Sequence, residues 1–450
     1  MLAGLQAGQL AQADRIQLER AIEDYNKGNS EAAEPILRDL AKGHPDEFEI
    51  IETLGLVYAE RGELQRAVPL LEGACRANPS SAEAAANLGV AYLKLNRIQQ
   101  AIGTLRHAIS LNSKNSQTQS SYGQALMAAR RQPEAARAFA AAAQGEPDNP
   151  DILYNWALAE FESGNAAQAT KILARIPPKL RSPQAESLCG DAEESQDHLD
   201  RAFVCFQNAA KLDPSEPNLN AVGLELLKHW SFDGAIKIYQ YASEQYPASP
   251  RLQAGLGIAL YGNAQYEKAA AVFSRLLLSF PSEAHARLLG ISCDALKTQA
   301  DECEELFRYL SLHSSDIAAA SLAAAAVLEW HDTARYALAR ELLGNVIARD
   351  RGSADGYYNM GVLDQAEAKW NESIPMLTHA ISLRPHWSSA HLRLAQAYKH
   401  LDQNDQAHRE ASLASHFRSE EDAAMQNKRE VIKTFVMDER ASLAVSSAAH

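Results

Sequence analysis

Aromatic residues make up only 7% of this 450-residue chain, and runs of β-branched residues are scarce. Sheets are enriched in both kinds of residue, whereas helices favour the alanine and leucine that dominate here. The composition therefore argues against a β protein and favours packed helices. A hydrophobic content of 46% also excludes wholesale disorder.

The chain has no excess of basic residues either. Its 43 Lys and Arg residues stand against 57 Asp and Glu residues, which gives a formal net charge of −14. Proteins that bind nucleic acid need clustered cations to neutralise the phosphates, so we expect no nucleic-acid partner. An acidic surface favours basic or apolar protein partners instead.

Long hydrophobic runs are missing as well, since no window reaches the roughly 18 apolar residues of a membrane helix. The best candidate, 317–328, ends at Glu329 and indicates a buried helix. Residues 1–13 are either a flexible N-terminus or the remnant of an export signal, with Ala11 to Ala13 as its cleavage site. The compartment stays open accordingly: cytoplasmic by default, periplasmic or secreted if a signal peptide lies upstream.

The five cysteines form no CxxC motif and have no histidine at metal-ligand spacing. We therefore expect no metal site and no cofactor. Two interpretations of the cysteines remain open. They are small buried hydrophobes, or Cys189 with Cys205 and Cys293 with Cys303 form disulfides in an oxidising compartment.

What the chain does contain is a pattern that returns about every 34 residues. Small residues recur at fixed places between large apolar ones, and a proline often ends the unit. The first clear unit has Leu54, Gly55, Tyr58, Ala67, Leu71, Ala74 and Pro79; the next has Leu88, Gly89, Tyr92, Ala101, Leu105 and Ala108; the third has Tyr122, Gly123, Leu126, Ala135, Phe139, Ala142 and Pro147. The small residues let two helices cross closely, and proline stops the second helix because it lacks an N–H group.

Over about residues 14–413 this pattern resembles the tetratricopeptide repeat (TPR) family. The resemblance implies an all-α, right-handed α-solenoid of about twelve helix hairpins plus a C-terminal capping helix. We expect one array of about eight repeats over 14–291, running into a ninth, and further repeats over 354–413. Between them, 292–353 lacks the Leu-Gly and Pro positions of the repeat. This stretch is therefore predicted to form degenerate helix pairs with a phase slip, which would divide the array.

Local signals predict three further features. Pro177 and Pro178 should end the second helix of the fifth unit early. Helix N-caps are expected at Asp46, Ser80, Asp148 and Ser215. Apolar residues at helical spacing predict that 414–441 forms the capping helix, with a disordered tail over 442–450. The apolar face consists of Met425, Val431, Ile432, Phe435 and Val436. Such a helix caps the final repeat, or else it binds a partner or a second copy.

The family's geometry implies a concave face lined by the first helix of each unit. Three polar residues would form a ladder for an extended peptide, three apolar residues a landing surface, and three acidic residues a preference for basic peptides. These candidates are Asn87, Ser121 and Asn155; Tyr154, Leu158 and Phe161; and Glu52, Glu83 and Asp151. The competing interpretation is that the Asn side chains satisfy local backbone groups and the acids are solvated surface.

No set of residues typical of a catalytic site stands out, so we expect no enzymatic activity. The sequence predicts a scaffold or adaptor that binds a protein or an extended peptide. The alternative is a non-catalytic accessory subunit of an export, envelope-assembly or glycan-handling enzyme complex. The identity of the partner, the pathway and the oligomeric state do not follow from the sequence.

Overall fold

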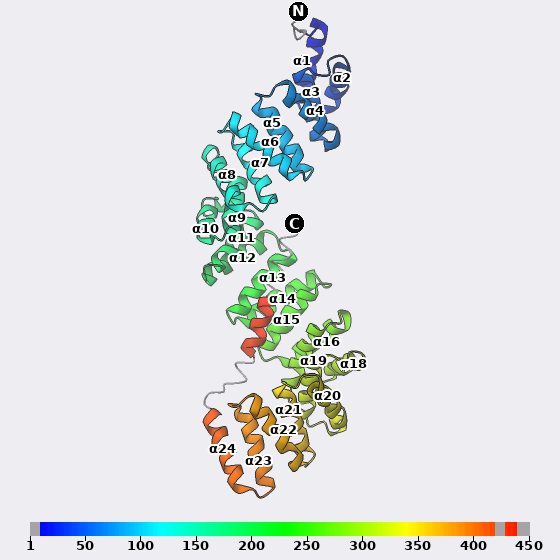
Figure 1. Ribbon diagram of the computed structural model, residues 1–450, viewed down its shortest axis with the longest axis vertical. Coiled ribbons are helices and arrows are strands. Elements are labelled where there is room, and N and C mark those ends of the chain that lie inside the picture. The colour runs from blue at the N-terminus through cyan, green and yellow to red at the C-terminus, as the bar shows by residue number, and fades with distance from the viewer. Residues whose placement is uncertain (1–9, 419–427, 439–450) are drawn as a thin grey trace, which may run out of the picture. The chain divides into compact units, whose positions relative to one another are not determined.

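The computed structural model describes residues 10–418 and 428–438, and over these ranges the chain is helical and has no β-strand. It divides into two compact units, Met1–Leu212 and Asp213–His450. Twelve successive pairs of α-helices account for Gln12–Arg418 (Figure 1). The all-α repeat fold predicted from the sequence is confirmed.

The first unit contains six helix pairs and one short 3-10 helix. The elements are α1 (Gln12–Asn26), α2 (Ser30–Gly43), α3 (Phe48–Glu60), α4 (Leu64–Ala77), α5 (Ala82–Lys94), α6 (Ile98–Leu111), α7 (Ser116–Ala128), α8 (Gln132–Gly145), α9 (Pro150–Glu162), α10 (Ala166–Leu173), η1 (Pro178–Leu180), α11 (Pro183–Glu194) and α12 (Leu199–Leu212).

The glycines of the repeat lie where the two helices of a pair cross. A Cβ atom on Gly89 of α5 would lie 2.5 Å from Cγ of Leu105 on α6, and one on Gly123 of α7 would lie 2.7 Å from Cζ of Phe139 on α8. Real Cβ atoms do not approach other heavy atoms so closely, and helix interiors are already packed densely. The small residue is therefore a condition for the observed helix spacing.

Proline shortens the fifth pair as expected. Helix α10 has 8 residues, whereas α8 of the preceding pair has 14. Pro178 instead begins η1, and Pro183 occupies the first turn of α11, where its missing N–H group has no cost.

Three of the four expected N-caps are displaced by one residue. The N-cap positions are Glu47, Ser81 and Asn149 in place of Asp46, Ser80 and Asp148. Ser81 accepts a hydrogen bond from the amide of Ala84, and Asn149 accepts from those of Asp151 and Ile152. Ser215 is an N-cap as expected, without a side-chain cap bond in the described structure.

The second unit continues the same architecture with six more pairs. The elements are α13 (Glu216–Lys228), α14 (Phe232–Gln245), α15 (Pro250–Gly262), α16 (Tyr266–Ser279), α17 (Glu283–Asp294), η2 (Asp301–Cys303), α18 (Glu304–Leu312), α19 (Ile317–Glu329), η3 (Thr333–Arg335), α20 (Tyr336–Arg349), α21 (Ala354–Ala366), α22 (Trp370–Leu383), α23 (Ser388–His400) and α24 (Asn404–Arg418).

The irregular stretch 292–353 does not divide the array. Helix α16 packs on α17, α17 on α19, and α20 on α21, so packing continues through it. The boundary between the compact units falls earlier, after Leu212. The 3-10 helices η2 and η3 begin α18 and α20, and buried residues such as Leu306, Ala323 and Leu343 keep the core continuous where the Leu-Gly and Pro punctuation is missing.

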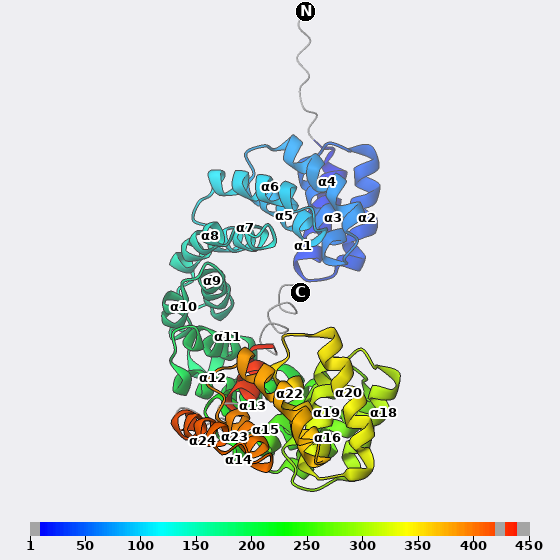
Figure 2. The same cartoon turned by 60° about the horizontal axis from the view of Figure 1, so that its bottom comes forward.

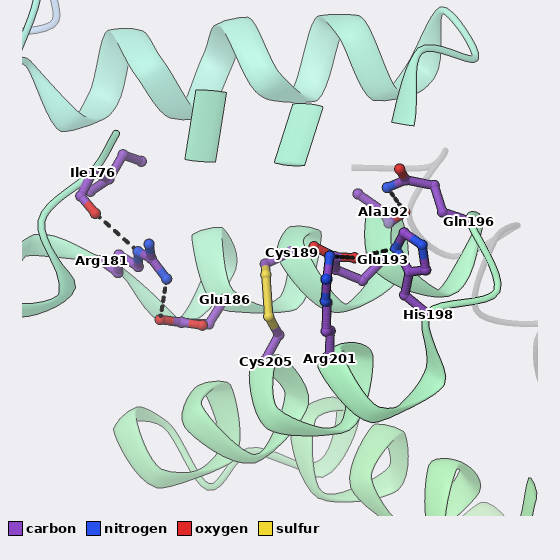
Figure 3. Close-up of a disulfide and its surroundings, with 10 residues drawn as sticks. All are labelled: Ile176, Arg181, Glu186, Cys189, Ala192, Glu193, Gln196, His198, Arg201 and Cys205. Carbon is purple, nitrogen blue, oxygen red and sulfur yellow. Dashed lines mark hydrogen bonds and ion pairs between the residues drawn. A yellow bond between two sulfur atoms is a disulfide. The ribbon is translucent and has the colours of Figure 1, made fainter. Parts of the chain in front are cut away.

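Two disulfides link neighbouring elements, which answers the question that the sequence left open. Cys189 on α11 is bonded to Cys205 on α12, and Cys293 on α17 is bonded to Cys303 of η2. Figure 3 shows the first disulfide together with the Arg181–Glu186 ion pair, whose N–O distance is 3.5 Å. Cys75 is a free cysteine, and burial raises the pKa of its thiol to about 11.

The predicted capping helix over 414–441 is described only in part. Helix α24 is described as far as Arg418, residues 419–427 lie outside the described residues, and 428–438 is helical. On that helix Ile432, Phe435 and Val436 are buried. Met425 and the expected tail 442–450 lie outside the described residues, as do residues 1–9 of the predicted N-terminal segment.

None of the helices in the described ranges combines the length and the apolar character that crossing a membrane requires.

Candidate functional site: the concave face of the first unit

The first helices of successive pairs line one side of the first unit. Helix α1 contacts α3, α3 contacts α5, α5 contacts α7, α7 contacts α9, and α9 contacts α11. Figure 2 shows α5, α7 and α9 along the inside of this unit's curve, with α6, α8 and α10 outside them. All nine candidate residues lie on four of these inner helices, α3, α5, α7 and α9.

Two members of the expected polar ladder offer free amide groups. Asn87 of α5 and Asn155 of α9 are partly exposed. Across residues 10–418 and 428–438, neither side chain forms a hydrogen bond to a backbone or side-chain group. The interpretation that these residues satisfy local backbone groups therefore has no support in the geometry. Each carboxamide can donate and accept one backbone-like bond to an extended peptide.

Ser121 of α7 does not share this exposure. Its residue surface is only 3% accessible, so Ser121 is buried in the packing of the helices. A short hydroxyl side chain in that position cannot reach a ligand. Ser121 thus leaves the ladder, which contains a gap at α7 between Asn87 and Asn155.

The amino-terminal end of this face is acidic. Glu52 of α3 is half-buried, and its Oε1 atom is buried with no hydrogen-bond partner in the described part of the chain. Burial raises the pKa of Glu52 to about 7, and the charges of Glu83 and Glu49 add to the effect. Glu83 on α5 is exposed. A cation placed here would relieve the repulsion between these carboxylates.

The other end of the face is apolar with a polar rim. Tyr154, Leu158 and Phe161 of α9 are partly exposed and pack on the buried cluster formed by α9, α10 and α11. Burial raises the pKa of the Tyr154 phenol, and the carboxylates of Glu162 and Asp191 raise it further. Asp191 belongs to α11, and the repeat pattern in the sequence does not reveal that it approaches Tyr154. Asp151, in the first turn of α9, is exposed.

Three residues with potential metal-ligand atoms lie close together in the first unit. Glu186, Cys189 and Cys205 each place a ligand atom within 4.8 Å of the other two, which is the only such set among the described residues. The two sulfur atoms are bonded to each other (Figure 3). A sulfur atom in a disulfide lacks the thiolate form that binds metals.

Comparison with known families supports the repeat assignment. Models described as tetratricopeptide repeat match residues 18–82, 58–129, 126–192 and 226–290. The chain belongs to the tetratricopeptide repeat family. TPR proteins generally mediate protein–protein interactions and act as scaffolds.

Individual relatives of this TPR protein are distant. A peroxisomal targeting signal receptor from Candida albicans is 27% identical over 178 residues, which cover 37% of this chain and 30% of the receptor. The match thus spans less than a third of that relative's length. Among solved structures, Pseudomonas aeruginosa pilF is 24% identical, with a TM-score of 0.38, over 46% of this chain and 95% of its own. The Naa15/Naa10 complex bound to HypK-THB contains a chain that is 16% identical, with a TM-score of 0.38, over 89% of this chain and 68% of that one.

Proposed function

We propose that this TPR protein is a scaffold that holds an extended, basic peptide segment of a partner on the concave face of its first unit. The observation that carries the proposal is the pair of unbonded carboxamides, Asn87 and Asn155, on parallel inner helices. They lie between an acidic end at Glu52 and Glu83 and an apolar end at Tyr154 and Phe161. Backbone bonds to the amides would supply affinity, and the two ends would select the side chains.

The proposal predicts that removing the exposed side chains weakens binding without unfolding the unit. The combined change Asn87→Ala, Tyr154→Ala and Phe161→Ala should lower affinity at least about tenfold, which corresponds to about 1.4 kcal/mol. The measurement is the binding of labelled full-length chain to an immobilised array of octapeptides of varied charge. We expect the peptides that bind to be enriched in Lys and Arg.

A matched control changes exposed residues of the same unit that lie outside its first helices. Gln99→Ala, Gln100→Ala and Leu180→Ala remove two exposed amides and one exposed apolar side chain from α6 and η1. This control should bind as the unmodified chain does. Equal binding by both triple variants, with circular dichroism unchanged, would reject the site.

Titration of Glu52 gives a second test, because its pKa lies near 7. Above that value the carboxylate is charged, so binding of basic peptides should strengthen between about pH 6 and pH 8. Glu52→Gln should flatten this dependence. In calorimetry, binding to the unmodified chain near pH 7 should release a proton, since a bound cation lowers the pKa. A pH profile identical in the Gln variant would contradict the role of Glu52.

The raised pKa of Glu52 also makes the stability of the fold depend on pH. The folded-state pKa of Glu52 lies above its ordinary value of 4.5, so the folded chain binds the proton more tightly than the unfolded chain. Its contribution is greatest below about pH 4.5 and is lost as the pH rises through about 7. The melting temperature of Glu52→Gln should therefore exceed that of the unmodified chain by more at pH 8 than at pH 5.

A second candidate function has one observation in its favour. An accessory subunit of an export or envelope-assembly complex would work in an oxidising compartment, and the two disulfides fit that environment. Mass spectrometry of chain isolated from its source under thiol-blocking conditions tests this candidate. Fully alkylated cysteines at 189 and 205 would reject it.

A further inference from the structure

The second unit contains a groove of its own, with a volume of about 1200 Å³. It runs mainly along first helices, from Tyr261 of α15 through Ile291 of α17 and Leu322 of α19 to Val362 of α21 and Gln396 of α23, and a few residues of α20 and α22 also line it. These helices occupy the same places in their pairs as the inner helices of the first unit. The groove is therefore the second unit's equivalent of a TPR ligand-binding face.

The chain's own helix 428–438 forms one wall of this groove. Glu430, Val431 and Thr434 line it together with α15, α17, α19, α21 and α23. The helix lies beside α13 in both Figure 1 and Figure 2, where it is drawn in red. Most of the groove, towards α23, is lined by the array itself and extends beyond the helix.

The helix is amphipathic, and its apolar face is covered. Ile432, Phe435 and Val436 are buried, whereas Met437 on the same helix is 60% exposed. Positions i, i+3 and i+4 lie on one side of an α-helix, so the three buried residues form a single stripe. This stripe lies on the other side of the helix from Glu430, Val431 and Thr434, which line the groove. Burial of one apolar stripe is how amphipathic helices generally dock on a protein surface.

The first turn of the helix adds cationic contacts. Nζ of Lys428 lies 5.7 Å from the ring centroid of Tyr266, and Cζ of Arg429 lies 5.6 Å from that of Trp230. Cations over aromatic faces are attracted by the ring quadrupole. Lys428 is partly buried, and this burial lowers the pKa of its ammonium group.

These contacts place the helix away from the last repeat. Trp230 follows α13 and Tyr266 begins α16, so the contacts are with the first two pairs of the unit, whereas the last pair is α23 and α24. A cap for the final repeat would cover α24. The helix instead lies on the face where TPR ligands bind, which makes it a ligand-like segment.

We propose that the groove of the second unit is a docking site for an amphipathic helix and that 428–438 occupies part of it as a built-in competitor. The matching partner is a helix with apolar residues at i, i+3 and i+4 and a basic first turn. An isolated helix of this length is marginal in water, so it is stabilised by the groove. Because helix 428–438 is attached to the chain, its effective concentration at the groove is high. A partner helix must therefore bind the groove tightly enough to displace it.

The test uses the full-length chain and a fluorescent synthetic peptide with the sequence of residues 428–438. Ile432→Asp with Phe435→Asp in the chain removes the apolar anchors and vacates the groove. The peptide should then bind this variant at least tenfold more tightly than the unmodified chain. Met437→Asp, an equally charged change on the exposed side of the same helix, should leave the weak binding of the unmodified chain unaltered.

Four outcomes would overturn the proposal. The first three are equal peptide affinity for the vacated and unmodified chains, equal binding of a peptide carrying both Asp substitutions, and a dimer of the unmodified chain in light scattering that the Asp substitutions abolish. Hydrogen exchange of the backbone amides tests the proposal on the unmodified chain, without any substitution. Amides of 428–438 should be protected, and excess peptide should accelerate their exchange; unprotected amides would also refute it. The first unit's peptide face is a separate site, so these results are independent of the function proposed above.

Discussion

Gly255→Ala should destabilise the second unit by about 3 kcal/mol, the upper part of the range for overpacked cores. A Cβ atom at this position of α15 would lie 2.3 Å from Cε1 and 2.4 Å from Cζ of Tyr239 on α14. The ring cannot retreat, because a Cβ on Gly223 of α13 would lie 2.4 Å from Cζ on its other side. Tyr239 is fully buried, and its hydroxyl group donates a hydrogen bond of 3.3 Å to Oδ1 of Asn220.

The slot between two glycines explains why one methyl group has such an effect. Tyr239 fills the space between α13 and α15, so both inner helices must move apart if the ring moves. In a repeat protein each pair contacts only its neighbours, so the damage should stay local. We expect hydrogen exchange to accelerate in α13–α15 and to remain unchanged in α1–α8.

The matched control is Gly344→Ala on α20 of the same unit. A Cβ there meets no atom within 4 Å, so the change removes only the conformational freedom of glycine within a helix. It should stabilise the chain by about 0.5–1 kcal/mol. Urea unfolding followed by circular dichroism measures both variants. If Gly255→Ala shifted the midpoint upward as Gly344→Ala does, the packing argument would be wrong.

The sequence predicted the repeat because its pattern is a local consequence of helix crossing. Gly89 faces Leu105 and Gly123 faces Phe139 at the expected places in the pattern, so the small and large residues could be paired without a structure. N-caps were less predictable. Ser80 and Ser81 are chemically alike, and only the backbone angles of the turn decide which one caps α5.

The candidate site was predictable only in part. Helical periodicity placed Asn87 and Asn155 on the inner helices, but it could not show that Ser121 on the same face is buried, since burial depends on how the neighbouring helices pack. The approach of Asp191 to Tyr154 and the docking of 428–438 beside Trp230 are contacts between separate elements. Tertiary packing, which no local pattern encodes, decides them.

The disulfides also could not be decided from the sequence, and the Cys189–Cys205 bond gives the last prediction. Reduction, or Cys189→Ala with Cys205→Ala, should destabilise the first unit by about 3 kcal/mol, because a bond between residues 16 apart restricts the unfolded chain. The bond joins α11 to α12 directly after the shortened helix α10, where one partner helix offers less packing area.

Thermal melting with and without a reductant measures the effect. The unmodified chain should melt lower when reduced, and the Cys189/Cys205 double variant should retain only the smaller shift that Cys293–Cys303 causes, since that bond spans 10 residues. Cys75→Ala is the control, because Cys75 is a free thiol and its removal should leave the reductant effect intact. If the melting temperature of the unmodified chain were the same with and without reductant, the Cys189–Cys205 bond would contribute no stability. The packing of α11 on α12 alone would then hold this pair together.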